Sequence, residues 1–145
     1  MRKFLLIGIV FLVALFLYLS MMNAKELDNA KELNWENNYK KALATAKKEN
    51  KMVYLFIGAD VCTHCDRFKE QTLSNKELIE TMKEDYVLLY MSRDQHKIPD
   101  GFEKYGVPMH YFLTSDANVT AVVKGSRELE GWYDVLDEID LMKEK

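Results

Sequence analysis

The segment "MVYLFIGADVCTHCDRF", residues 52–68, joins an apolar run to the two cysteines of the chain, Cys62 and Cys65. Residues 52–57 are continuously apolar and rich in strand-forming types, which predicts a short strand buried on both faces. A helical pattern begins at Cys62. The segment therefore places a Cys-x-x-Cys pair where a buried strand ends and a helix begins.

The sequence around this strand predicts helices and a second strand. Apolar residues recur at helical spacing over residues 35–50, and another helical region covers residues 62–84. That second region is broken near Ser74 or Asn75, either of which can cap a new segment. The apolar run "YVLLYM", residues 86–91, then predicts a second buried strand.

The last part of the chain predicts a hairpin and a helix. Two short runs of strand-forming residues, 109–113 and 119–123, flank the turn "TSDAN". An amphipathic helix follows, and its apolar face consists of Leu129, Trp132, Leu136 and Ile139. The order helix, strand, helix, strand, hairpin, helix predicts an α/β fold with a central mixed β-sheet and helices on both faces.

The N-terminus has the pattern of an export segment. Arg2 and Lys3 precede a mainly apolar run, residues 4–22. The run is long for a cleaved signal peptide and close to the length of a membrane span. Residues 1–24 are therefore predicted to be either a signal peptide or an N-terminal membrane anchor. Both alternatives place the rest of the chain in the periplasm or another extracytoplasmic space, because the positive residues precede the run.

The remaining chain divides into a spacer and a domain. Residues 25–34 are charged and predict a spacer, and residues 35–145 have the length of one domain. Of the 20 Lys and Arg residues, two lie in the export segment, and the rest are mixed with 23 Asp and Glu residues. A nucleic-acid surface would need a basic stripe, so no nucleic-acid partner is expected.

Several kinds of site use a Cys-x-x-Cys pair. Covalent haem attachment needs a histidine directly after the second cysteine, where this chain has Asp66. An iron–sulfur cluster normally needs four ligands. Zinc stays open with Cys62, Cys65 and two histidines as ligands, although the histidines lack zinc-finger spacing. The histidines of the chain are His64, His96 and His110.

A redox disulfide explains more of the pattern than an inert one. A bridge between Cys62 and Cys65 closes a very short loop and would stabilise the fold little. Cys62 at a helix N-terminus is expected to be the attacking thiolate, and Cys65, one turn later, to resolve the mixed disulfide. Thr63 and His64 lie between the cysteines and are expected to tune the reduction potential, because stabilising the reduced form raises it.

Two stretches resemble the thioredoxin-fold family. "NWENNYKKALATAKKENKMVYLFIGADVCTHCDRFKEQTL", residues 34–73, resembles its opening helix, strand and active-site helix. "KYGVPMHYFLTSDANVTAVVKG", residues 104–125, resembles its proline loop, hairpin and glycine. The likeness is greatest to the exported thioredoxin-like group that includes the C-terminal domain of the transmembrane thiol reductase. It implies a thioredoxin fold and thiol–disulfide oxidoreductase activity, with no metal or organic cofactor.

The resemblance also implies site residues and partners. Pro108 would be a cis proline opposite the cysteines, and Val107 would offer its backbone to an extended substrate segment. Val61 completes the expected substrate groove, and Val61 with Met109 is a candidate exposed apolar surface. The implied partners are exported cysteine-containing proteins and a membrane redox partner.

Departures from the family pattern bear on the direction of electron flow. Val61 stands where the family usually has Trp, and Phe56 stands where thioredoxin has a buried Asp that accepts a proton. His64 before the second cysteine resembles disulfide isomerase and the periplasmic disulfide oxidase. We expect a reductase or isomerase, with an oxidase as the second alternative and a non-catalytic peptide-binding module of the same fold as the third.

Overall fold

The computed structural model describes residues 11–18 and 35–143. Contacts divide the chain into two units, Met1–Asn34 and Trp35–Lys145. In the first unit, residues 11–18 are helical and exposed. The rest of the predicted signal or anchor, and the predicted spacer, lie outside the described residues. Within the described part of the chain, none of the helices combines the length and apolar character that a membrane crossing requires.

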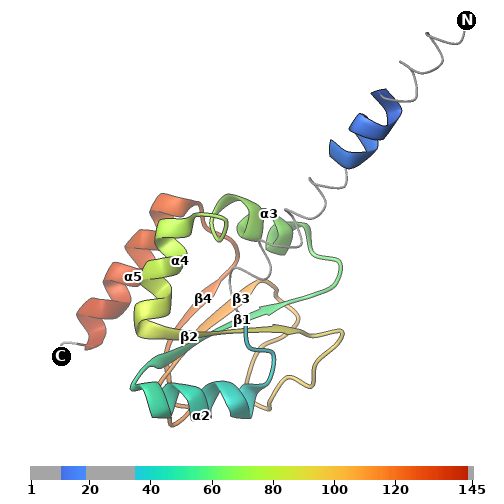
Figure 1. The fold of residues 1–145 in the computed structure, drawn as a ribbon. Coiled ribbons are helices and arrows are strands. Elements are labelled where there is room, and N and C mark those ends of the chain that lie inside the picture. The colour runs from blue at the N-terminus through green and yellow to red at the C-terminus, as the bar shows by residue number, and fades with distance from the viewer. Residues whose placement is uncertain (1–10, 19–34, 144–145) are drawn as a thin grey trace, which may run out of the picture. The chain divides into compact units, whose positions relative to one another are not determined.

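The second unit is built on a four-stranded sheet in the order β2-β1-β3-β4 (Figure 1). β1 (Met52–Gly58) and β2 (Tyr86–Ser92) are parallel, which requires a crossover connection between them. β3 (Met109–Leu113) and β4 (Val119–Lys124) form the predicted antiparallel hairpin, and β3 also pairs antiparallel with β1. The mixed sheet that the sequence predicts is confirmed.

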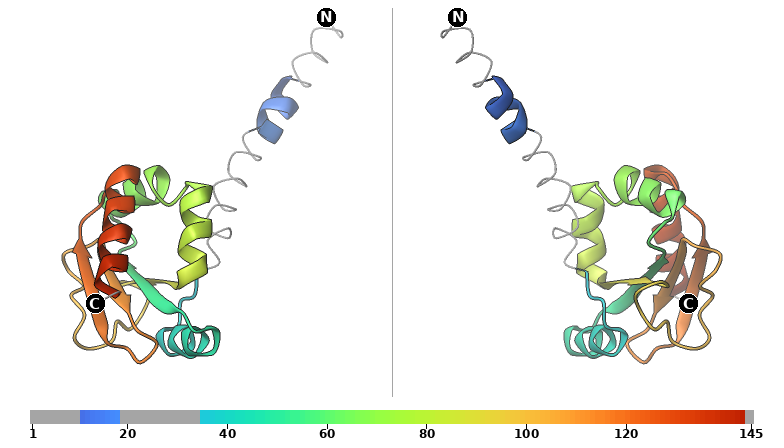
Figure 2. Two further views of the ribbon diagram at one scale, coloured as in Figure 1. Left: turned by 90° about the vertical axis from the view of Figure 1, so that its left-hand side faces the viewer. Right: turned by 90° about the vertical axis from the view of Figure 1, so that its right-hand side faces the viewer.

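Helices cover both faces of the sheet (Figures 1 and 2). α2 (Tyr39–Glu49) lies on one face, and α3 (Thr63–Gln71), α4 (Lys76–Asp85) and α5 (Leu129–Lys143) lie on the other. α3 and α4 make up the crossover between the two parallel strands. The predicted break between them is also confirmed, because Asn75 caps α4 by accepting a hydrogen bond from the backbone of Leu78 at 2.9 Å.

The first helix begins later than its apolar spacing predicts. Asn38 caps α2, so the helix starts at Tyr39, and the prediction that it starts at residue 35 is wrong. Glu36 instead pairs with β2, donating from its N–H to Leu88 O at 2.8 Å and accepting from Tyr90 N–H at 2.9 Å. These backbone hydrogen bonds cover the outer edge of β2, which helical spacing alone does not reveal.

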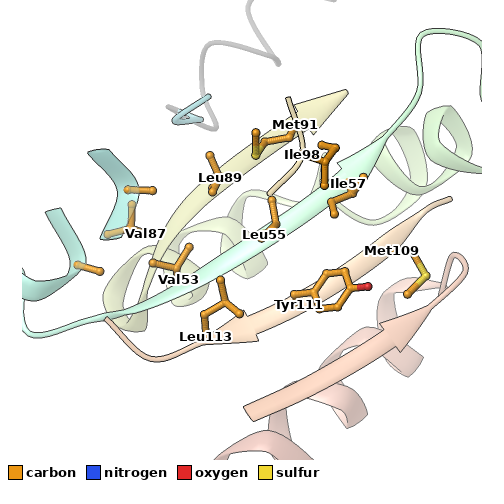
Figure 3. Packing of buried hydrophobic residues seen from close by; sticks show 12 residues of the cluster. Val53, Leu55, Ile57, Val87, Leu89, Met91, Ile98, Met109, Tyr111 and Leu113 are labelled. Atoms are coloured by element: carbon orange, nitrogen blue, oxygen red, sulfur yellow. The ribbon is translucent and has the colours of Figure 1, made fainter. Parts of the chain in front are cut away.

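Each face of the sheet has its own core. Figure 3 shows the face under α2, where alternate residues of β1, β2 and β3 point to the same side. The opposite face is aromatic and packs against α3 and α5. Its fully buried rings are Tyr54, Phe56, Phe68, His110, Phe112 and Trp132. Burial on both faces explains why β1 is continuously apolar.

Candidate active site

Cys62 lies at the N-terminus of α3 and caps that helix. Its Sγ accepts a hydrogen bond from the backbone N–H of Cys65 at 3.1 Å, as a serine or aspartate oxygen does at such positions. The two cysteines form a disulfide, with their Cα atoms 5.2 Å apart. Cys62 is partly exposed and Cys65 is fully buried. A substrate therefore reaches Cys62 first, and the free N–H groups of the helix favour a thiolate there.

The proline loop lies at the same end of the sheet as the cysteines. The Val107–Pro108 peptide bond is cis, as the resemblance implies. Pro108 is buried and Val107 is partly exposed. β3 begins at the next residue, Met109, which pairs with Ile57 near the end of β1. Val61 follows Ile57 by four residues and directly precedes Cys62 of the disulfide.

The exposed apolar residues of this region differ from those predicted. Val61 is 92% exposed, as the predicted surface requires, whereas Met109 is 5% exposed and packs in the core under α2. The prediction for Met109 is wrong because β3 is buried on both faces, and alternation merely directs Met109 into the core under α2. Tyr105 is 77% exposed in the loop before the proline. Arg93 anchors that loop by donating to Tyr105 O at 3.1 Å, and no sequence periodicity marks either residue.

The residues between the cysteines lie on the outside of the motif. Thr63 and His64 form the first turn of α3, and both are exposed. A side chain in this position can approach a thiolate at the helix N-terminus without being buried. Their effect on the reduction potential stays a prediction.

A polar network holds the connection between β1 and α3. The carboxylate of Asp60 accepts hydrogen bonds from Ser92 Oγ at 2.6 Å and from Gln95 Nε2 at 2.9 Å. The backbone N–H of Asp60 donates to Asp94 Oδ2 at 2.8 Å. The hydrogen bonds from Ser92 and Gln95 lower the pKa of Asp60, so it stays ionised. The network fixes the segment that leads into Cys62.

His110 is buried in the aromatic core, where its ring packs against Phe68 and Trp132. Its Nδ1 lies 2.8 Å from the hydroxyl of Tyr54, and its Nε2 lies 3.2 Å from Gly125 O. Because a carbonyl only accepts, Nε2 carries the proton and Nδ1 accepts from Tyr54. Desolvation lowers the pKa of His110 to about 3, so the ring is neutral.

Three of the candidate zinc ligands have other partners in this structure. Both ring nitrogens of His110 are engaged in the core, and both sulfurs of the motif are in the disulfide. Among residues 11–18 and 35–143, no group of three or more His, Cys, Asp or Glu side chains could hold a metal ion.

Comparison with known proteins decides the family. A family model described as thioredoxin-like matches residues 34–115, more than half of the chain. The chain belongs to the thioredoxin-like family. The family model, the α/β fold and the Cys62–Cys65 disulfide at a helix N-terminus agree with the thioredoxin fold that the sequence predicts.

Curated relatives of this thioredoxin-like protein are longer than the region they share with it. Anterior gradient protein 2 homolog from Homo sapiens is 34% identical over 97 residues, covering 65% of this chain and 53% of the relative. Spermatogenesis-associated protein 20 from Homo sapiens is 28% identical over 93 residues, covering 57% of this chain and 12% of the relative. The chain thus spans about half or less of the length of these relatives.

Solved structures share the fold at low sequence identity. A thioredoxin from Thermus thermophilus superposes with a TM-score of 0.59 at 22% identity, covering 71% of this chain and 84% of that one. The DsbH oxidoreductase gives a TM-score of 0.57 at 18% identity, covering 72% and 82%. The C-terminal domain of DsbD from Neisseria meningitidis, in its oxidised form, gives 0.54 at 16% identity, covering 68% and 89%.

Proposed function

We propose that this protein is an extracytoplasmic thiol–disulfide oxidoreductase that reduces or isomerises disulfides in exported proteins. The observation that carries the proposal is the unequal burial of the two cysteines at the start of α3. A structural bridge has no need of an accessible sulfur, whereas an exchange reaction requires one. The basic and apolar pattern of residues 1–24, as a signal peptide or an anchor, supports the location. Residues 25–34 then serve as the spacer and residues 35–145 as the catalytic domain.

The reaction follows from the two sulfurs. The Cys62 thiolate attacks one sulfur of a substrate disulfide, a mixed disulfide forms, and the other substrate sulfur leaves as a thiolate. Cys65 then attacks Cys62 Sγ, so the Cys62–Cys65 bond forms and the second substrate thiolate leaves. The substrate gains two electrons and two protons, and the cysteine pair loses them. A membrane redox partner that supplies electrons would restore the dithiol.

The substrate groove is proposed to lie between the cysteines and the proline loop. Val107 is partly exposed just before β3, and this exposure supports a role in which its backbone pairs with an extended segment. Pro108 shapes the floor, and the exposed side chain of Val61 borders the groove next to Cys62. Such a groove would take an extended segment with an accessible disulfide.

An oxidase of the same fold is the second candidate. His64 is exposed in the first turn of α3, where a positive charge or a hydrogen bond would favour the reduced thiolate. That effect makes the disulfide a stronger oxidant. The in-cell redox state of the pair separates the two directions.

Trapping of mixed disulfides tests the proposal. A Cys65→Ala variant lacks the resolving thiol, so it should accumulate mixed disulfides through Cys62 with exported cysteine-containing proteins. Non-reducing electrophoresis and mass spectrometry of the trapped species identify them. The matched Cys62→Ala variant should trap none. Equal trapping by both variants, or full activity of Cys62→Ala in cells, would favour a non-catalytic binding module.

A further inference from the structure

Lys69 is a half-buried cation on the helix that carries the active site. Its Nζ lies 4.4 Å from the ring centroid of Tyr90 and 5.8 Å from that of Phe56. Both rings belong to adjacent strands, since Phe56 of β1 pairs with Tyr90 of β2. The ammonium is therefore held between α3 and the sheet, where aromatic faces take the place of part of its hydration.

The position of Lys69 relative to Cys65 follows from helix geometry. The two residues are four apart in α3, so they lie on the same helix face. Side chains of a helix lean toward its N-terminus, which directs Lys69 back over the turn that contains Cys65. Cys65 is fully buried, so its thiolate would form away from bulk water and would need a nearby positive charge.

Among the described residues, the groups that contact Lys69 or act on its charge do not supply a positive charge. Phe56 has no titratable group, and Tyr90 and the carboxylates of Asp60 and Asp66 are neutral or negative. Asp66 on α3 and Asp60 before it act on Lys69 by their charge, while burial is the larger effect and lowers the pKa of Lys69. Tyr90 presents its hydroxyl over Gly58, where an added Cβ would meet it at 2.9 Å.

Three aspartates act on Tyr90, the ring that faces the Lys69 ammonium. Burial raises the pKa of Tyr90, and the charges of Asp60, Asp66 and Asp94 raise it further. Tyr90 therefore stays a neutral phenol at neutral pH. The three aspartates are exposed, so water screens them more than it screens the half-buried ammonium.

We propose that Lys69 is a positioning residue for the resolving step, and that its ammonium stabilises the thiolate of Cys65. The inference rests on the redox role proposed for the two cysteines. In the mixed disulfide, the Cys65 thiol loses its proton to water, and the thiolate attacks Cys62 Sγ. The Cys62–Cys65 bond forms, the bond from Cys62 to the substrate breaks, and the departing substrate thiolate takes up a proton.

The test measures the resolving step separately from the first attack. Reduced full-length protein is mixed with the aromatic disulfide dithiobisnitrobenzoate in a stopped-flow instrument. Attack by Cys62 releases one coloured thiolate at a rate proportional to reagent concentration, and attack by Cys65 releases the second at a rate independent of it. At neutral pH, Lys69→Met should slow the second phase about tenfold, as expected for loss of one close opposite charge.

The pH profile and two further variants distinguish loss of the Lys69 charge from a change in the structure around Cys65. The second phase of Lys69→Met should recover as the pH rises, because hydroxide then forms the thiolate without help. Lys69→Arg keeps the charge and should stay within about threefold of the wild type. Arg67→Met removes the same charge from another face of α3 and should leave the second phase unchanged. Thermal unfolding should show that the Lys69 variants stay within about 5 °C of the wild type.

Two results would overturn the inference. One is a second phase in Lys69→Met that equals the wild-type rate at neutral pH. The other is a slowing that is the same at every pH, which would indicate displaced geometry. If Lys69→Met does not fold, Lys69→Gln replaces it with the same expected profile. If the wild-type protein releases no coloured thiolate at all, the redox function itself fails, and this outcome is distinct from both.

Discussion

His110 links the aromatic core to the pH dependence of stability. The folded protein keeps this ring neutral until the pH falls to about 3, whereas the ordinary pKa in an unfolded chain is 6.5. Between these values the unfolded chain binds more protons, so stability falls as the pH falls. The slope attributable to His110 should approach about 1.4 kcal/mol per pH unit in the middle of this range, where the unfolded ring is protonated and the folded ring is not. Denaturant unfolding at a series of pH values measures it.

His110→Gln is the matched variant for that measurement. Glutamine keeps a donor and an acceptor for Gly125 and Tyr54 but does not titrate. It should be less stable at neutral pH and should lose stability less steeply between pH 6.5 and 3, the range set by the two pKa values of His110. Parallel curves for the two proteins would show that His110 does not contribute to acid sensitivity.

His64 should influence the potential of the disulfide without affecting the fold. It is exposed in the first turn of α3, so replacing it removes no core contact. His64→Ala should lower the reduction potential by tens of mV, because about 30 mV corresponds to ~1.4 kcal/mol of lost stabilisation of the reduced form. Equilibration with glutathione buffers gives the potential. An unchanged or higher potential would remove His64 from the set of tuning residues.

α3 depends on an active-site residue for its cap. Cys62 Sγ accepts from the backbone of Cys65, so a side chain that cannot accept leaves that N–H without this partner. Cys62→Ser should be more stable than Cys62→Ala by about 1 kcal/mol, although both lose the redox reaction. Urea unfolding of the two variants under reducing conditions provides the comparison. Equal midpoints would show that the cap contributes little to α3.

The elements that the sequence predicts best are those with one strong local signal. β1 and β2 are continuous apolar runs, and Asn75 is a good capping residue at a break in the pattern. The start of α2 is missed because Trp35 fits helical spacing but packs against Tyr54 of β1 while its neighbour pairs with β2. Tertiary contact overrides local pattern there.

The sequence predicts only those site residues that belong to a local sequence pattern. The cysteine pair and Pro108 are visible in the sequence because each has a fixed place relative to a strand. The role of Lys69 is not visible in the sequence, because a lysine one turn after Cys65 has the pattern of a solvated residue. Only the fold shows that its ammonium packs over the ring of Tyr90 in β2. Met109 is misassigned because both faces of β3 are buried, and the residues around Pro108 do not reveal what packs on them.

The domain as a whole should not depend on its disulfide. The bridge closes a loop with only two intervening residues, and the two cores of the sheet are formed by other side chains. Reduction with dithiothreitol should therefore leave the far-ultraviolet circular dichroism and the cooperative unfolding transition in place. Loss of cooperative unfolding on reduction would identify the bridge as a structural staple and would argue against a redox cycle.

The most direct test of the proposed function is the redox state of Cys62 and Cys65 in living cells, trapped by acid quench and thiol alkylation. A reductase or isomerase must be kept supplied with electrons, so the account predicts that most of the pair is in the dithiol form. The Cys62→Ala variant provides the alkylation standard for a single free thiol. A pair that is mostly disulfide would contradict the reductase or isomerase assignment and would support the oxidase or an idle disulfide in a binding module.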